Sequence, residues 1–228
     1  NFVPVEVHWS EVPGRDEKWK EETIKNTSEA QFQTEFECEF LGSVDTLINA
    51  SKLKTMVAID PQRSGKFDVW EKPKPKHIYT VCVDVARGIS NDYSAAVVVD
   101  CTKAPYKIVA KFRDNDIKPI VFPSILQKLG NAYNKAFMLI EINDLGQQVA
   151  DSLMYELEYD NMMMVTQRGR SGQVLGGGFS GRGNQLGLRM TKGTKKIGTS
   201  NLKSLIEANK LIVNDFDMIS ELSTFIAK

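Results

Sequence analysis

The sequence has few cysteines, few histidines and no long apolar run, and these shortages exclude several classes of protein. The three cysteines, Cys38, Cys82 and Cys101, are an odd number without CxxC spacing, which argues against a disulfide framework and predicts buried, reduced thiols in a cytosolic setting. No run of about 18 apolar residues occurs, so neither a membrane-spanning helix nor a membrane partner is predicted. The two histidines, His8 and His77, are isolated, and we expect them to be ordinary packing or surface residues rather than metal ligands.

Two further absences concern charge and nucleotide binding. Lys plus Arg and Asp plus Glu both number 29 in a chain of 228 residues, so net charge predicts no class of partner and any electrostatic argument must be local. No GxxxxGKS/T phosphate loop occurs, which argues against a P-loop ATPase domain. The chain starts with Asn1 and has no signal-peptide pattern, so we expect it to be a fragment of a longer protein.

The pattern of apolar residues divides the chain into a leading segment, residues 1–76, and a core, residues 77–228. The leading segment has helical patterns at 17–25 and 28–39 and ends in the proline-rich connector EKPKPK. In the core we predict three strands at short spacing, at 79–86, 95–101 and 106–112, and then alternating helices and strands. The later helices are predicted at 124–134, 146–158, 200–209 and 218–226, and the later strands at 136–142, 162–166 and 211–213. This order predicts an α/β fold in which an antiparallel meander and later parallel strands form a mixed sheet with helices on both faces.

Two carboxylates interrupt apolar strands of the core. Asp84 lies between Val83 and Val85, and Glu141 follows the run Phe-Met-Leu-Ile at the end of its strand. We expect both to be desolvated, which is costly unless a cation or hydrogen-bond donors compensate. If the two strands are neighbours, the acids face each other, and oxygen ligands alone favour Mg²⁺ or Mn²⁺ over zinc. The alternative is structural, with each acid hydrogen-bonded to a turn or loop at its strand end.

Residues 168–196 are rich in glycine and contain no acidic residue. The stretch carries Arg168, Arg170, Arg182, Arg189, Lys192, Lys195 and Lys196. Glycine backbone and basic side chains together suit a loop that lays backbone amides and Arg or Lys side chains against phosphates. A solvated loop without a ligand is the alternative.

Several motifs together resemble a known family. The stretches VDVARGISNDYSA and MLIEINDLGQQVAD, with FQTEFECEFLGSVDTLI before them and SGQVLGGGFSG after them, resemble the nuclease half of the large terminase subunit of tailed bacteriophages, closest to the myovirus type. The resemblance covers nearly all of the chain. It implies a ribonuclease-H-like fold and a metal-dependent endonuclease that cuts concatemeric double-stranded viral DNA during packaging. It also implies Asp84 and Glu141 as catalytic metal ligands, with two ions in the complete site, and Asp92 as a supporting acid.

The same resemblance implies partners and a missing part. The partners would be double-stranded DNA, the portal protein, the small terminase subunit and an ATPase domain of the same polypeptide, which this sequence lacks, all meeting at the viral prohead in the host cytoplasm. A third catalytic carboxylate is expected beyond Lys228. Asp215 and Asp217 are the nearest acids within the chain, and we expect them to be helix-start residues instead.

Two other functions stay open. One is a DNA-gripping translocation module whose acids cut nothing, which predicts DNA binding without metal-dependent cleavage. The other is a phosphate site of the actin-like or sugar-kinase kind, because an Asp in a β-hairpin followed by Gly also opens such sites. That interpretation needs a second hairpin of this kind and an adenosine motif, and the sequence has neither.

Overall fold

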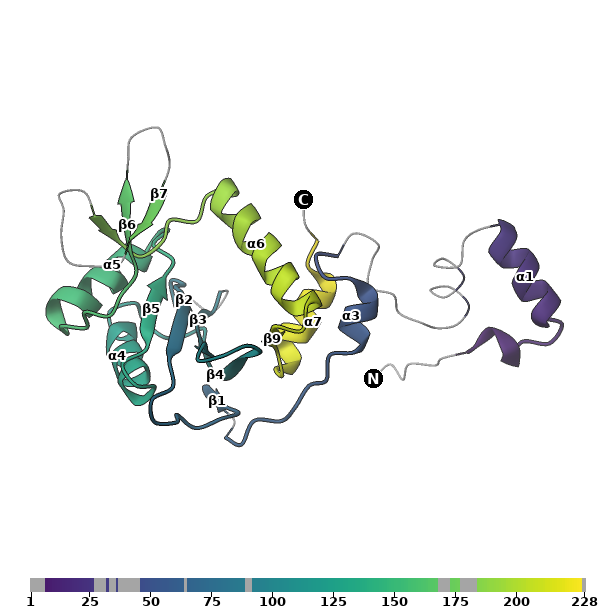
Figure 1. Ribbon diagram of the computed structural model, residues 1–228, viewed down its shortest axis with the longest axis horizontal. Coiled ribbons are helices and arrows are strands. Elements are labelled where there is room, and N and C mark those ends of the chain that lie inside the picture. Colours follow the sequence, from purple (N-terminus) through teal and green to yellow (C-terminus); the bar gives the residue numbers. More distant parts are fainter. Residues whose placement is uncertain are drawn as a thin grey trace. The chain divides into compact units, whose positions relative to one another are not determined.

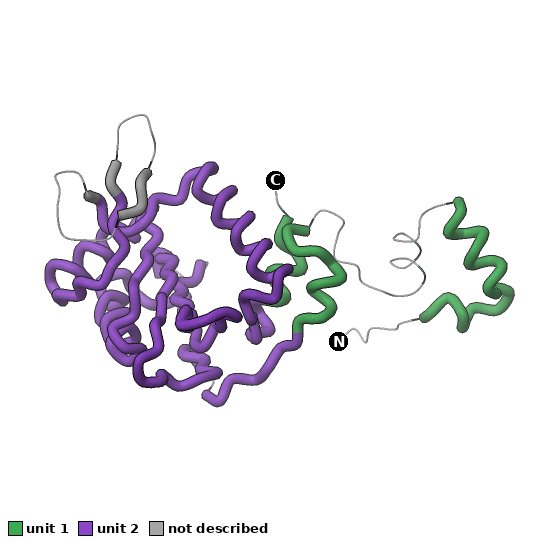
Figure 2. The backbone as a smooth tube through the Cα atoms, in the orientation of Figure 1, with its two compact units in different colours: residues 1–56, 219–228 green, residues 57–218 purple. Residues whose placement is uncertain are grey.

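The chain forms two compact units (Figure 2), Val57–Met218 and a smaller unit of Asn1–Met56 with Ile219–Lys228. The structure is a computed structural model that describes residues 7–26, 32, 36, 46–63, 65–88, 92–167, 173–176 and 184–226. The division at residue 76 into a leading segment and a nuclease core stays a prediction.

A six-stranded mixed sheet is the frame of the larger unit (Figure 1). Five strands follow one another across the sheet in the order β1 (Phe67–Val69), β4 (Tyr106–Asp114), β3 (Ser94–Asp100), β2 (Tyr79–Asp84) and β5 (Phe137–Ile140). The sixth strand, β9 (Leu211–Ile212), pairs with β4. The strands β2, β3 and β4 pair antiparallel, whereas β5 joins β2 in parallel. The predicted meander and its crossover to a parallel neighbour are therefore confirmed.

One face of this sheet is closed by α4 (Phe122–Ala132) and α5 (Gly146–Asp151), which continues as a π-helical turn over Ser152–Glu156. Alternate residues of each strand point to this face, so Val81 and Val98 form one hydrophobic core with Leu126 of α4. Each of these three side chains is fully buried. The β-branched strand residues and the period of α4 thus produce the element types that the sequence predicts.

The opposite face is covered only in part. Asp215 and the start of α7 (Phe216–Thr224) lie over Lys111 of β4, whereas Cys82 and Asp84 of β2 are exposed. The prediction that the thiols are buried is wrong for Cys82, because its side chain lies on this face; Cys101 is partly buried, and both are free cysteines.

The helix that carries the lysines of the basic stretch begins earlier than the sequence predicts. It is α6 (Lys192–Glu207), not a helix starting at residue 200, because Thr191 and Thr194 form a capping box at its first turn. The predicted strand at 162–166 is also placed differently. It is β6 (Met164–Gln167), which pairs with β7 (Gln173–Gly176) and β8 (Asn184–Leu186) in a separate three-stranded sheet.

The smaller unit contains a 3-10 turn (Trp9–Glu11), α1 (Glu17–Asn26) and α3 (Ala50–Lys54). The rings of Trp9, Trp19 and Phe36 pack together, with Trp19 and Phe36 edge to face at 5.2 Å between centroids. The predicted helix at 28–39 lies almost entirely outside the described residues. Among the helices that the structure describes, none has the length and apolar character to cross a membrane.

Candidate carboxylate site

The structure brings the two predicted acids together at one edge of the sheet. Val83 of β2 lies beside Ile140 of β5, and the backbone N–H of Glu141 donates to the carbonyl of Val83 at 2.9 Å. Asp84 and Glu141 are the next residues of the two parallel chains, so their side chains leave on the same face. That face is the open one, because Val83 and Ile140 point to the core.

The two acids differ in burial, and this corrects one expectation. Asp84 is exposed, because it is the last residue of β2 on the uncovered face, so the prediction that it is desolvated is wrong. Glu141 is half-buried. Burial raises the pKa of the Glu141 carboxyl, the negative charge of Asp84 raises it further, and the positive charge of Lys195 acts in the opposite direction. Two carboxylates of like charge side by side are stabilised by a cation.

Two glycines permit the close packing of backbone around Glu141. A Cβ atom at Gly146 would lie 1.8 Å from the carbonyl oxygen of Glu141, so only glycine allows α5 to begin here. Gly187 has a φ of +74°, and a Cβ atom there would lie 2.4 Å from Cγ2 of Ile142. The sequence predicts Gly187 only as part of the glycine-rich basic stretch, and it predicts no role for Gly146, although Gly146 lies in the motif that contains Glu141.

The segment after Gly187 runs alongside Glu141 and leads into α6. The N–H of Leu188 donates to the carbonyl of Ile140 at 2.8 Å, and the N–H of Ile142 donates to the carbonyl of Leu188 at 3.1 Å. The Asn143 side chain donates to the carbonyl of Met190 at 3.0 Å and accepts from the N–H of Met190 at 3.1 Å. Sequence reasoning missed Asn143, whose one signal was its position two residues after Glu141.

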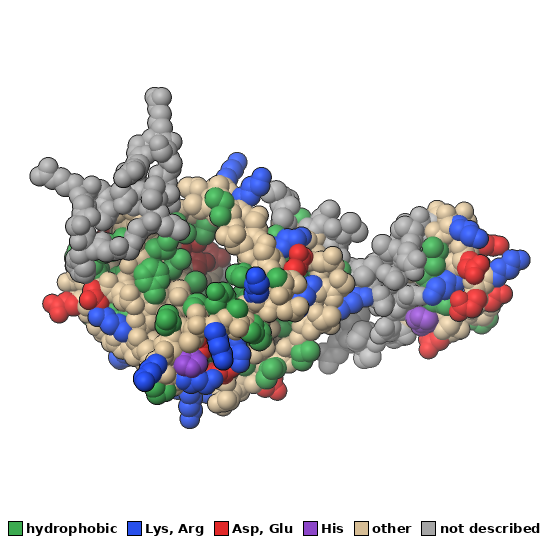
Figure 3. All heavy atoms as spheres, viewed as in Figure 1, with side chains coloured by type: hydrophobic (Ala, Val, Ile, Leu, Met, Phe, Trp, Pro, Cys, Tyr) green, Lys and Arg blue, Asp and Glu red, His purple; other side chains and the backbone are tan. Residues whose placement is uncertain are grey.

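Four of the predicted DNA-binding residues lie within the described part of the chain, at or just before the start of α6. Lys192, Lys195 and Lys196 are exposed in the first turns of α6, and Arg189 is exposed just before it. Lys and Arg side chains stand out from this end of α6 in Figure 3. The structure therefore places these lysines on a helix rather than in a loop. The other predicted DNA-binding residues, Arg168, Arg170 and Arg182, lie outside the described residues.

The remaining acids near the site differ in what they contact. Asp92 is exposed in the connection between β2 and β3. Asp215 caps α7 by accepting from the N–H of Met218 at 2.8 Å, and it binds Lys111 at 2.6 Å. Asp217 contacts Lys111 at 3.1 Å and Arg113 at 3.3 Å. The prediction that Asp215 and Asp217 are helix-start residues is confirmed, and their bonds to these cations leave them unsuited to replace a third ligand.

The donor set at the sheet edge fits a hard divalent cation. Two carboxylates from adjacent strands supply oxygen ligands, and a Mg²⁺ ion held in this way keeps several waters. Within the described part of the chain, no group of three or more His, Cys, Asp or Glu side chains gathers as a ligand set. At this edge of the sheet, Asp84 and Glu141 are the two predicted acids that the structure brings together.

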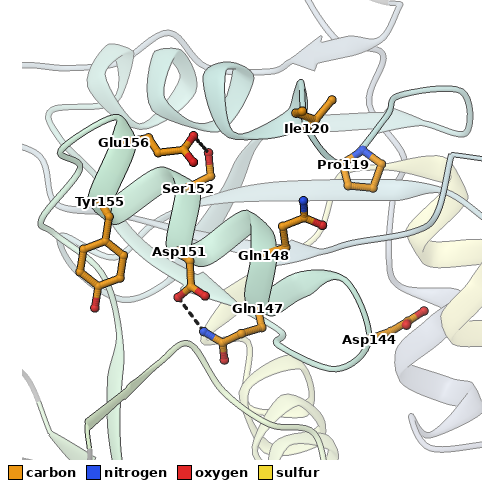
Figure 4. Close-up of a pocket in the computed structure, with 9 residues that line it drawn as sticks. All are labelled: Pro119, Ile120, Asp144, Gln147, Gln148, Asp151, Ser152, Tyr155 and Glu156. Atoms are coloured by element: carbon orange, nitrogen blue, oxygen red, sulfur yellow. Dashed lines mark hydrogen bonds between the residues drawn. The ribbon is translucent and has the colours of Figure 1, made fainter.

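A pocket of about 600 Å³ lies beside α5 and is separate from these two acids (Figure 4). It is lined by Pro119 and Ile120 and by polar or exposed residues of the segment that begins at Asp144, namely Asp144, Gln147, Gln148, Asp151, Ser152, Tyr155 and Glu156. Its acids have partners close by, since Gln147 donates to Asp151 at 2.8 Å and Ser152 donates to Glu156 at 2.7 Å. No predicted site residue lines this pocket, and we assign it no chemistry.

Comparison with known proteins agrees with this geometry. The family model described as Terminase RNaseH-like domain matches residues 81–228. The fold is similar to that of the large terminase nuclease from thermophilic phage G20c in a crystal structure with bound magnesium, at 20% identity and a TM-score of 0.60 over 81% of this chain and 82% of that one. It is also similar to the large terminase nuclease domain of Thermus phage P74-26, at 22% identity and a TM-score of 0.52 over 76% and 75% of the two chains. The expected ribonuclease-H-like fold is thereby confirmed.

Proposed function

The chain belongs to the family of terminase RNaseH-like domains, and we propose that it is a divalent-metal-dependent endonuclease that cuts double-stranded viral DNA during packaging into the phage head. One observation carries the proposal: Asp84 and Glu141 lie side by side on the open face, next to a helix whose first turns bear three lysines. Carboxylates beside a basic surface suit hydrolysis of a phosphodiester.

Asp84 and Glu141 would hold the metal, Mg²⁺ or Mn²⁺, with two ions in the complete site. Structures of the G20c nuclease with cobalt, magnesium or zinc support the use of a divalent ion. When bound, such ions activate the attacking water and stabilise the leaving oxygen. Asp92, exposed in the hairpin connection, would act as a supporting acid.

The protein's own residues position the duplex. The exposed lysines of α6, with Arg189, Arg168, Arg170 and Arg182, would bind phosphates of the backbone and carry no sequence information. In the cell the partners would be the portal protein, the small terminase subunit and an ATPase domain, at the prohead in the host cytoplasm.

Metal dependence tests the proposal directly. Supercoiled plasmid incubated with the protein should be nicked and linearised in Mg²⁺ or Mn²⁺, and EDTA should stop cleavage while DNA binding persists, because the lysines do not depend on the metal. Gel electrophoresis and a filter-binding assay measure the two properties. Binding without cleavage at every metal concentration would instead favour the DNA-gripping module, which the exposed lysines of α6 also support.

A charge reversal tests the DNA-binding surface. We expect the triple variant Lys192→Glu, Lys195→Glu and Lys196→Glu to weaken binding to all duplex sequences alike and to reduce the slope of log affinity against log salt by roughly 2 to 3. As a matched control, reversal of Lys18, Lys25 and Lys54, exposed lysines of the smaller unit, should leave the slope unchanged. A loss of affinity confined to one sequence would mean that these lysines read bases.

A further inference from the structure

We propose that Asn143 is a positioning residue that holds the lysine-bearing first turn of α6 in register with Glu141, so that a DNA strand bound by the lysines meets the carboxylate pair. The inference rests on the proposed function and adds a residue to it. It is carried by the contacts between two segments, the end of β5 and residues 187–191.

The first turns of α6 have little packing of their own. Along residues 192–205, all of which the structure describes, no side chain is buried, and Ile206 is the first one that is. The far end of α6 is fixed instead at the opposite edge of the sheet, where the N–H of Tyr106 donates to the carbonyl of Lys210 at 2.8 Å. A helix anchored at its far end can swing at its beginning unless the segment before it is held.

Asn143 holds that segment by the side chain. Its amide pairs with both the carbonyl and the N–H of Met190, the residue before the helix cap Thr191. Leu188 pairs with the backbone on both sides of Glu141. The segment 187–191 therefore contacts the backbone on both sides of Glu141 and also fixes where α6, which carries Lys192 and Lys195, begins.

The consequence for catalysis is geometric. DNA affinity depends on lysines that stay on the helix whatever its direction, whereas cleavage depends on the distance between the held phosphate and the acids. Displacement of a reacting group by about 1 Å can lower a rate a hundredfold. Loss of the Asn143 bonds should therefore affect turnover much more than binding.

The test compares Asn143→Ala with Asn161→Ala. Asn161 donates to the carbonyl of Lys135 at 2.7 Å, and its own carbonyl accepts from Met138, so it ties a neighbouring segment to the other end of β5. For a fluorescent duplex we expect Asn143→Ala to lower kcat about tenfold, with duplex affinity in EDTA almost unchanged. Asn161→Ala should leave kcat near its original value. Amide hydrogen exchange should quicken at residues 188–195 in the Asn143 variant alone.

Each outcome decides the proposal. Equal kcat in Asn143→Ala and the unaltered protein, or equal losses in the two variants, would overturn it. If Asn143→Ala does not fold, Asn143→Ser, which keeps a hydroxyl for the N–H of Met190, should give an intermediate kcat, and an unchanged kcat there overturns the proposal too. If the unaltered protein cuts no DNA in any metal, the proposed function fails. The exchange measurement then tests by itself whether Asn143 holds the start of α6 in place, and unchanged exchange at residues 188–195 in Asn143→Ala refutes that role.

Discussion

Replacing Glu141 by Gln is expected to lower the rate of metal-dependent DNA cleavage by at least about a hundredfold, because loss of even an indirect partner of a metal ligand costs roughly 10- to 100-fold. The fold should survive. Burial and the charge of Asp84 both disfavour the ionised form of Glu141, so removing its charge relieves a repulsion. Plasmid cleavage in Mg²⁺ and in Mn²⁺, together with thermal unfolding, measures both expectations.

Asp144→Asn is the matched control for Glu141→Gln. It removes one negative charge three residues further on, where Asp144 pairs with Arg87 at 2.9 Å on the surface. Asp144 has a φ of +52°, a conformation that Asn tolerates well. Cleavage by this variant should stay close to that of the unaltered protein. Full cleavage by Glu141→Gln would show that other acids carry the chemistry.

Replacing Lys111 by Met is expected to cost about 3 to 5 kcal/mol of unfolding free energy, the usual loss when one partner of a buried ion pair is removed. Lys111 is 5% exposed and Asp215 is 4% exposed, so the substitution leaves a buried carboxylate without its cation. The Nζ atom of Lys111 also lies 3.5 Å from Asp68 and 3.1 Å from Asp217. Urea denaturation followed by circular dichroism gives the free energy.

Two further variants separate charge from packing at this cluster. Lys107→Met removes a lysine of the same strand whose partner, Glu71, is at 3.1 Å near the surface, and it should cost less than about 1 kcal/mol. Adding Asp215→Asn to Lys111→Met should restore part of the stability, because Asn still caps α7 and the unpaired charge is gone. A double variant no more stable than Lys111→Met would show that lost packing, not charge, explains the effect.

The same cluster predicts a pH dependence. Burial alone lowers the pKa of Lys111, but its hydrogen bonds to Asp215 and Asp217 outweigh burial and raise the pKa above the ordinary 10.5. A raised pKa in the folded state means that this stabilisation is complete below the ordinary lysine pKa and is lost as pH rises through the folded value. The stability difference between the unaltered protein and Lys111→Met should therefore persist at neutral pH and shrink in strong alkali.

Most element types, and the meeting of Asp84 and Glu141 at one edge of the sheet, follow from local patterns in the sequence. Val-rich runs specify β2 and β3, and β4 follows at short spacing with further apolar residues, since β-branched and aromatic side chains suit a pleated, half-buried surface. The crossover rule then places β5 beside β2, which was enough to predict that Asp84 and Glu141 meet. The start of α6 escaped this reasoning, because glycines and lysines suggest a loop and the Thr191–Thr194 capping box is a weak local signal.

The burial of each acid, and the contacts that hold the segment before α6 beside Glu141, follow from the packing of distant segments. Asp84 is exposed because α4 and α5 cover the other face of its strand. The alternation of residues along the strand does not predict which of its two faces the helices cover. Asn143 meets Met190 across 47 positions, and Lys111 meets Asp215 across 104. Such contacts join groups that share no local pattern, because they depend on how distant segments pack once the sheet has assembled.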